Sequence, residues 1–232
     1  RHFASMLTDF GCAYKCTYCP ISTIGFKLRG IDEVIEEIEY LRSRGVREIY
    51  FRDQTFGVNK KRTFELCERL EPFDIGWTCF TRVDVLSVDL LEAMKGAGCH
   101  TVMFGIETVN DELLLEYKKG TTVNQVREAI ALCKEHGLDV VGFFIIGLPG
   151  DTMSAMLSTI DFAKTSGIDF ASFNKAMPRL GTTLRSEAIE AGYADAGSLD
   201  LDSSTSDPQW KDQNLSNEEI SMLHRKAYRS FY

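Results

Sequence analysis

Short β-rich runs alternate with amphipathic stretches over most of the 232 residues, and this alternation restricts the possible folds more than any other feature. Strands that alternate with helices pair in parallel through right-handed crossovers. The run at 138–146 is almost continuously apolar, as expected of a parallel strand buried on both faces. The pattern predicts an α/β fold and leaves open whether the strands form a doubly wound sheet or a partial barrel. We expect strands at 3–8, 46–51, 75–81, 100–106, 138–146 and 168–174, and helices at 32–44, 59–70, 110–118, 123–136, 152–165 and between Ser87 and Gly98.

The C-terminal part of the chain differs from these repeats. Residues 195–214 are acidic and rich in serine, and we interpret them as a loop or a cover over the substrate. A closing helix follows, with Ser216 predicted as its N-cap and Glu219 completing a capping box. Its apolar side chains share one face, which we expect to pack against the rest of the fold.

Composition bounds the possible functions. A formal net charge of −8, with no basic stripe to offset it, argues against a nucleic-acid or lipid-surface partner. An apolar content of 44% and a charged content of 26% are ordinary for a globular protein. Because no signal peptide and no transmembrane run is recognisable, we expect a cytoplasmic protein. Four cysteines have apolar neighbours and are predicted to be small core residues: Cys67, Cys79, Cys99 and Cys133.

The other three cysteines, Cys12, Cys16 and Cys19, stand within eight residues in the loop after the first predicted strand. Their spacing, C-x3-C-x2-C, is too tight for a disulfide framework. Three thiolates on one short loop can hold three irons of a [4Fe–4S] cluster and leave the fourth iron open for a substrate. Two alternatives remain on the residues alone. A structural zinc site needs a fourth ligand, for which His2 is the nearest candidate, and a disulfide with a spare thiol needs a secreted protein.

This loop, with the aromatic Tyr18 before its third cysteine, resembles the signature of the radical S-adenosylmethionine (SAM) enzymes. The resemblance extends to about residue 185 and implies a six-stranded parallel partial (β/α)6 TIM-like barrel with a C-terminal helical extension. It implies a [4Fe–4S] cluster on Cys12, Cys16 and Cys19, with SAM chelated to the open iron and cleaved reductively to a 5′-deoxyadenosyl radical. A low-potential electron donor of the flavodoxin or ferredoxin type is then required. We expect a core at 1–185, an extension at 186–232, and a fragment of a longer chain.

In barrels the chemistry lies at the C-terminal ends of the strands. The resemblance implies that Asp53, with Gln54 beside it, accepts the SAM amino group, and that Glu107 accepts the ribose hydroxyls. Arg82 can grip a carboxylate bidentately, although a pair with Asp84 is an equal alternative.

The same resemblance implies that a basic residue shortly after Glu107 pairs with the SAM carboxylate. Lys119 is our candidate, and Lys118 competes with it. Tyr18, Gly147 and Leu148 are expected to flank the adenine, the glycine by permitting close backbone approach. No residue is assigned as catalytic.

Residues 52–56 (Arg-Asp-Gln-Thr-Phe) resemble the Asp-Asp-x-Phe segment of cobalamin-associated radical SAM proteins, with Gln54 in place of the second Asp. Trp77 and the closing Arg229-Ser-Phe-Tyr232 extend this resemblance, which favours C-methylation or cyclisation of a small molecule. Cobalamin is expected in a domain outside this chain, because no D-x-H-x-x-G run occurs here. The alternatives are a cobalamin-free enzyme of methylthiotransferase or porphyrin type and a non-catalytic metal-binding barrel.

Overall fold

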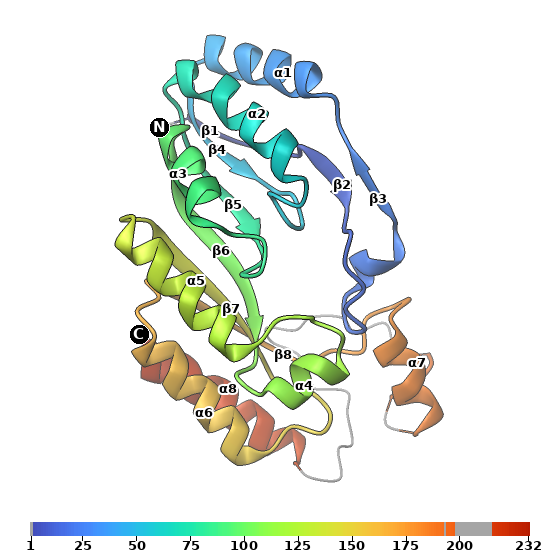
Figure 1. Ribbon diagram of the computed structural model, residues 1–232. Coiled ribbons are helices and arrows are strands. Elements are labelled where there is room, and N and C mark those ends of the chain that lie inside the picture. Colours follow the sequence, from blue (N-terminus) through green and yellow to red (C-terminus); the bar gives the residue numbers. More distant parts are fainter. Residues whose placement is uncertain (1, 193, 198–214) are drawn as a thin grey trace. The chain divides into compact units, whose positions relative to one another are not determined.

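The computed structural model describes residues 2–192, 194–197 and 215–232. Six strands form one sheet in the order β1-β4-β5-β6-β7-β8 (Figure 1), and the pairs β1–β4, β4–β5 and β5–β6 are parallel. The strands of this sheet therefore lie in the order in which they occur in the chain, and β2 and β3 form a separate two-stranded sheet. A doubly wound sheet reverses its order at a switch point, whereas a barrel does not. The order thus confirms the predicted α/β partial (β/α)6 TIM-like barrel class. The strands are β1 (His2–Met6), β4 (Val46–Phe51), β5 (Gly76–Thr81), β6 (Cys99–Glu107), β7 (Asp139–Ile146) and β8 (Phe170–Lys175).

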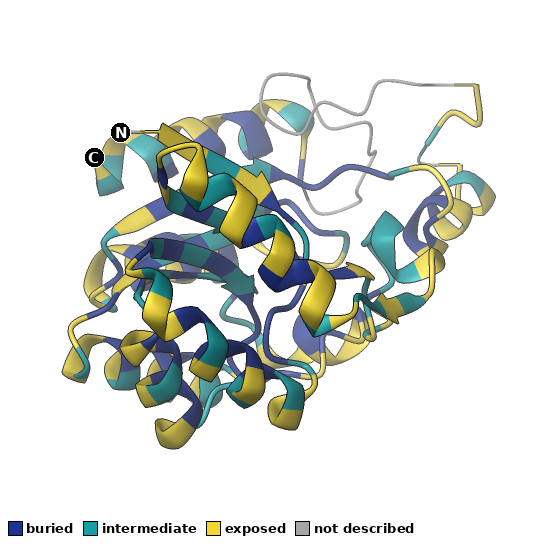
Figure 2. Cartoon of the chain, turned by 90° about the horizontal axis from the view of Figure 1, so that it is seen from above, coloured by how far each residue is buried: buried dark blue, intermediate teal, exposed yellow. Residues whose placement is uncertain are grey.

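Two compact units make up the chain, and β6 and β7 contribute residues to both. Unit 1 comprises Arg1–Ala13, Gly25–Gly105 and Gln125–Val141. Its helices are α1 (Ile31–Ser43), α2 (Lys60–Leu70), α3 (Val88–Gly96) and nearly all of α5 (Val123–Glu135), and the short helix η2 (Glu71–Phe73) follows α2. Figure 2 shows buried and exposed stripes along the helices, as amphipathic sequences require.

An aromatic cluster forms the core of unit 1. The ring of Trp77 lies 5.2 Å from that of Phe51 and 5.1 Å from that of Phe56. Its indole N–H donates to the carbonyl of Ala97 at 2.7 Å, so the one polar atom of the ring is satisfied. The four cysteines predicted as core residues are buried here as free thiols, and burial raises the pKa of Cys67 and of Cys133 to about 12.

Unit 2 comprises Tyr14–Ile24, Ile106–Asn124 and Gly142–Tyr232. It contains η1 (Pro20–Thr23), α4 (Asp111–Glu116), α6 (Met153–Thr165), α7 (Thr183–Glu190) and α8 (Asn217–Phe231). Helix α8 packs against β8 and α6, beside which it runs in Figure 1. The capping box of Ser216 and Glu219 is present as predicted, and Ile220, Leu223 and Ala227 of α8 are buried. The closing helix therefore packs as its apolar face indicated.

Several predictions of detail were incomplete or wrong. The strand expected at 3–8 ends at Met6, and a hairpin of β2 (Asp9–Gly11) and β3 (Phe26–Leu28) encloses the cysteine loop. Helix α7 was not predicted, although Thr182 caps it through a bond from Arg185 N–H. Most of the serine-rich segment, 198–214, lies outside the described residues. No helix in the described part of the chain is both long and apolar enough to span a bilayer.

Candidate functional site

The first cysteine of the loop belongs to unit 1. Cys12 follows β2, its N–H donates to the carbonyl of Gly25 at 3.3 Å, and its Sγ lies 3.9 Å from Oγ1 of Thr55. Gly11, at φ 77°, turns the chain into the loop in a conformation that suits glycine. Cys12 is therefore held where β2 enters the loop that connects it to β3, and beside the segment that follows β4.

The other two cysteines belong to unit 2, where Cys16 is buried and Cys19 is partly exposed. Cys19 N–H donates to the carbonyl of Cys16 at 3.2 Å. Thr17 fastens the loop to two other segments, because its N–H donates to the carbonyl of Tyr117 at 3.1 Å and its carbonyl accepts from Leu184 N–H at 3.2 Å. The loop that carries the cysteines is thus tied to the ends of α4 and α7.

The donors of this loop suit an iron–sulfur cluster. All seven cysteines lie in the described part of the chain and all are free thiols, so none of the three is engaged in a disulfide. Among the described residues, no three His, Cys, Asp or Glu side chains gather closely enough to surround a single metal ion. Thiolates are the usual ligands of [4Fe–4S] clusters. The chemistry of the three thiols fits such a cluster, and their assignment as its ligands stays a prediction.

Three predicted SAM contacts come together in unit 2, next to Cys16. Glu107 at the end of β6 and Lys119 form an ion pair, with Nζ 2.8 Å from Oε1. The side chains of the two residues are only 13% and 8% exposed. The hydroxyl of Tyr18 is buried, and its pKa is raised well above the usual value by burial, then by the negative charges of Glu107 and Cys16 nearby. A carboxylate, an ammonium and a phenol therefore share one poorly solvated place.

The backbone at this place is strained. Glu107 has φ 69° and Lys118 has φ 52°, conformations that cost non-glycine residues about 1–2 kcal/mol each. Residues in such strained conformations cluster at active sites and ligand-binding sites. Lys118 is exposed and Lys119 is buried, so of the two competing lysines only Lys119 pairs with Glu107.

An apolar cluster adjoins the ion pair. Tyr18 packs against this cluster, which contains Leu148 and Tyr117, and the Tyr117 ring lies 6.2 Å from that of Tyr18 in an edge-to-face arrangement. The Tyr117 hydroxyl donates to the carbonyl of Pro149 at 2.7 Å and so fixes the turn after β7. The other buried members are Leu113, Ala176, Leu184 and Ala188. Tyr18 and Leu148 thus belong to one apolar region, and their contact with the adenine stays a prediction.

The conformation of Gly147 has a structural explanation. Its φ is 83°, and a Cβ at this position would lie 2.8 Å from Cγ2 of Ile220 in α8. Close approach of helix α8 therefore requires glycine here. Thr152, and not the neighbouring Asp151, caps α6 by accepting from Ala155 N–H, while Asp151 accepts from Thr152 N–H.

Asp53 is buried and holds the chain before the cysteine loop. Its Oδ1 accepts from the N–H of Thr8 at 2.6 Å and from that of Asp9 at 3.2 Å, and its Oδ2 accepts from the Thr8 hydroxyl at 2.6 Å. Burial raises the pKa of Asp53, and these bonds oppose that rise. The predicted contact with SAM stays a prediction, but most of the acceptor capacity of this carboxylate is already used within unit 1.

Sequence reasoning missed two partners of Asp53. Asp9 is buried, its Oδ1 has no hydrogen-bond partner among the described residues, and its pKa is raised to about 7 by burial, then by Asp53. Arg62 in α2 opposes that shift and donates to the carbonyls of Thr8 and Arg29 at 3.0 Å. No sequence spacing indicates these contacts, since they join residues 33 to 54 positions apart.

The last two predicted residues lie in unit 1. Arg82 donates two hydrogen bonds to Asp84, at 2.8 Å and 2.9 Å. This pair with Asp84 is the alternative that the sequence left open for Arg82. Gln54 is exposed and lines a cavity of about 510 Å³ together with Arg52. Contacts of either residue with a cofactor remain predictions.

A model of the radical SAM superfamily matches residues 7–163. An uncharacterized methyltransferase of Pyrococcus horikoshii is 40% identical over 99% of this chain and 51% of its own length. A putative methylthiotransferase of Methanocaldococcus jannaschii is 30% identical over 74% of this chain and 41% of its own length. This chain thus spans about half of these relatives or less.

Among solved structures, the radical SAM methyltransferase TsrM from Kitasatospora setae, with cobalamin and a [4Fe–4S] cluster bound, is similar with a TM-score of 0.75. The match covers 94% of this chain and 43% of TsrM at 21% identity, a level at which the likeness concerns the fold alone.

Proposed function

The chain belongs to the radical SAM superfamily, and on that premise we propose that it binds a [4Fe–4S] cluster through Cys12, Cys16 and Cys19 and cleaves SAM reductively. The observation that carries the proposal is the buried Glu107–Lys119 ion pair beside Tyr18 and Cys16. Two charged groups in a poorly solvated place, next to a cluster ligand and an aromatic ring, match the charged and aromatic parts of SAM.

The roles of these residues follow from their chemistry. The Lys119 ammonium has more N–H donors than its one bond to Glu107 uses, so it can also bind the carboxylate of SAM. The Glu107 carboxylate has further lone pairs for the two ribose hydroxyls. Tyr18, packed against the apolar cluster that contains Leu148, offers an aromatic ring that suits the adenine. A bound cluster would supply the electron that breaks the sulfonium C–S bond, and a low-potential flavodoxin or ferredoxin would supply that electron in turn.

Methyl transfer with cobalamin is our proposal for the complete protein. It is supported by the similarity to a methyltransferase at 40% identity and by the fold shared with TsrM, which binds cobalamin. Cobalamin would be held outside these 232 residues. The second candidate is a cobalamin-free reaction, which the similarity to a putative methylthiotransferase favours.

The test compares the complete protein with this chain, both reconstituted anaerobically and supplied with reductant. We expect the two to convert SAM to 5′-deoxyadenosine and methionine, and only the complete protein to retain cobalamin. Absence of 5′-deoxyadenosine from both would refute SAM cleavage and leave a non-catalytic metal-binding barrel. A complete protein that cleaves SAM but retains no cobalamin would refute the methyl-transfer proposal alone.

A further inference from the structure

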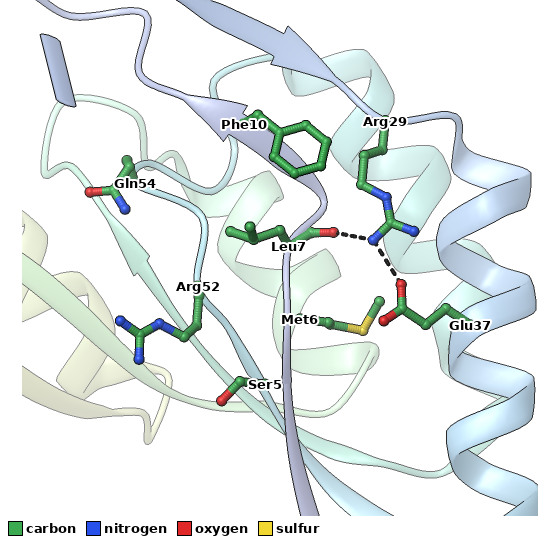
Figure 3. Close-up of a pocket in the computed structure, with 8 residues that line it drawn as sticks. All are labelled: Ser5, Met6, Leu7, Phe10, Arg29, Glu37, Arg52 and Gln54. Carbon is green, nitrogen blue, oxygen red and sulfur yellow. Dashed lines mark hydrogen bonds and ion pairs between the residues drawn. The ribbon is translucent and has the colours of Figure 1, made fainter. Parts of the chain in front are cut away.

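A cavity of about 510 Å³ lies wholly within unit 1, where β1 forms the edge of the sheet. This volume is within the range of sites for small organic molecules, about 300–1,000 Å³. Figure 3 shows Arg52 and Gln54 on one side of Leu7, and Arg29 and Glu37 on the other. The lining residues are Ser5, Met6, Leu7, Phe10, Arg29, Glu37, Arg52 and Gln54.

The strand pairing brings the polar residues of this lining together. Tyr50 lies in β4, Arg52 lies over the Tyr50 ring just after the strand ends, and Gln54 lines the same cavity as Arg52. Ser5 is the partner of Tyr50 across the β1–β4 pair, and Arg52 N–H donates to the carbonyl of Met6 at 2.8 Å. A hydroxyl from β1 and a guanidinium and an amide from the segment after β4 therefore line one cavity.

Only one charge of the lining is uncompensated. Arg29 forms an ion pair with Glu37 at 2.8 Å and donates to the carbonyl of Leu7 at 2.6 Å, so this pair is neutral as a unit. The Arg52 guanidinium lies over the ring of Tyr50, 5.3 Å from its centre, and no carboxylate of the described residues lies within ion-pair distance of it. Stacking on an aromatic face orients a guanidinium and leaves its N–H groups available for an acceptor.

The apolar part of the lining completes the site. Met6, Leu7 and Phe10 contribute hydrocarbon surface, and the Phe10 side chain is about half exposed. An exposed aromatic ring beside an oriented guanidinium suits a molecule that is apolar with one anionic end. A phosphate monoester carries close to two charges at neutral pH, more than the single free cation offers, whereas a carboxylate matches it in charge and in bidentate geometry.

We propose that this edge pocket binds a monocarboxylic acid with an apolar body, and that Arg52 binds its carboxylate. The proposal that the pocket binds such an acid depends only on the contacts described above. The further proposal that this acid is the substrate of the radical reaction depends on the proposed function as well.

The experiment titrates the cluster-loaded protein with 4-phenylbutyrate, with its primary amide and with 4-phenylbutyl phosphate, and follows binding by ligand-observed NMR. Because hydrogen bonds to a charged group contribute about 1.5–3 kcal/mol, we expect the carboxylate to bind about 10- to 100-fold more tightly than the amide. Arg52→Gln should remove that difference, and Arg52→Lys should restore it in part. Arg47→Gln is the matched control, since Arg47 is an exposed arginine of β4, the strand that Arg52 follows, and lies outside the pocket.

Each other outcome overturns the proposal. The role of Arg52 would be refuted if the carboxylate and the amide bind equally, if the carboxylate does not bind, or if Arg47→Gln weakens carboxylate binding as much as Arg52→Gln does. Tighter binding of the phosphate would refute the preference for a singly charged ligand. Weaker SAM binding in Arg52→Gln would assign Arg52 to the SAM site instead. If the carboxylate binds through Arg52 but the protein does not cleave SAM, the pocket stands and the proposed function fails.

Discussion

Two variants of the Glu107–Lys119 ion pair can distinguish its contribution to stability from its proposed role in SAM binding. The two properties should respond differently when one residue or both are replaced. Lys119→Met keeps an unbranched apolar side chain, one atom shorter, and removes the charge. Glu107, only 13% exposed and already close to Tyr18 and Cys16, then remains buried without its cation. Removing one partner of a buried pair destabilises a fold by about 3–5 kcal/mol. A total stability of about 5–15 kcal/mol makes that loss easy to measure.

The double variant Lys119→Met/Glu107→Gln has no unpaired charge at this place. Neutral replacement of a whole buried ion pair is often without net cost, so we expect stability to recover to within about 1 kcal/mol of the unsubstituted chain. SAM affinity should not recover, because both groups proposed to bind SAM have been changed. Lys118→Met, the exposed neighbour, should alter stability by about 0.5 kcal/mol or less and leave SAM affinity unchanged.

The measurements are urea unfolding of the cluster-free chain by circular dichroism and SAM binding to the cluster-loaded chain. A single variant that loses less than about 1 kcal/mol would refute the reasoning about the buried charge. A double variant that binds SAM as tightly as the unsubstituted chain would refute the assignment of both residues to SAM.

Three further results are expected. Gly147→Ala should cost about 1–3 kcal/mol more than Gly167→Ala, measured by urea unfolding, because both have positive φ but only Gly147 faces Ile220; equal costs would contradict the close packing of α8. The pKa of Asp9 is about 7 in the fold and near 3.8 in the unfolded chain, so between these values the folded chain keeps a proton that the unfolded chain has released. Stability should therefore decrease as the pH rises from about 4 to about 7. Asp9→Asn should flatten that dependence, and an unaltered profile would exclude Asp9 as its source. Iron and sulfide content should persist in folded variants in which any one of the core cysteines is alanine: Cys67, Cys79, Cys99 and Cys133.

The repeating part of the fold was predictable because it depends on local patterns. The strand 46–51 is observed with the predicted bounds, and helix α1 differs from its prediction by one residue at each end. The β2–β3 hairpin was missed because its strands have three residues each, too few for an alternating pattern. Helix α7 was missed because its 8 residues are too few to show a clear helical period.

The site was predictable in its residue types but not in its pairings. The position of Glu107 at a strand end indicated a polar site. Which of the adjacent Lys118 and Lys119 pairs with Glu107 depends on which side chain is buried, and two consecutive lysines give no sign of that. The hydrogen bonds of Asp53 with Thr8, and the bonds of Arg62 with Thr8, join distant segments and follow only from the tertiary structure. Arg82 was a candidate for a ligand carboxylate, and its own neighbour Asp84 supplies one.

The central claim is an open [4Fe–4S] cluster on Cys12, Cys16 and Cys19, and the EPR spectrum of the reduced, anaerobically reconstituted chain tests it most directly. Binding of SAM at an open iron should change the spectrum of the cluster, and replacing any one of the three cysteines by alanine should abolish the cluster while the four core thiols remain. A spectrum that SAM leaves unchanged, or a cluster that survives the loss of Cys16, would contradict the account.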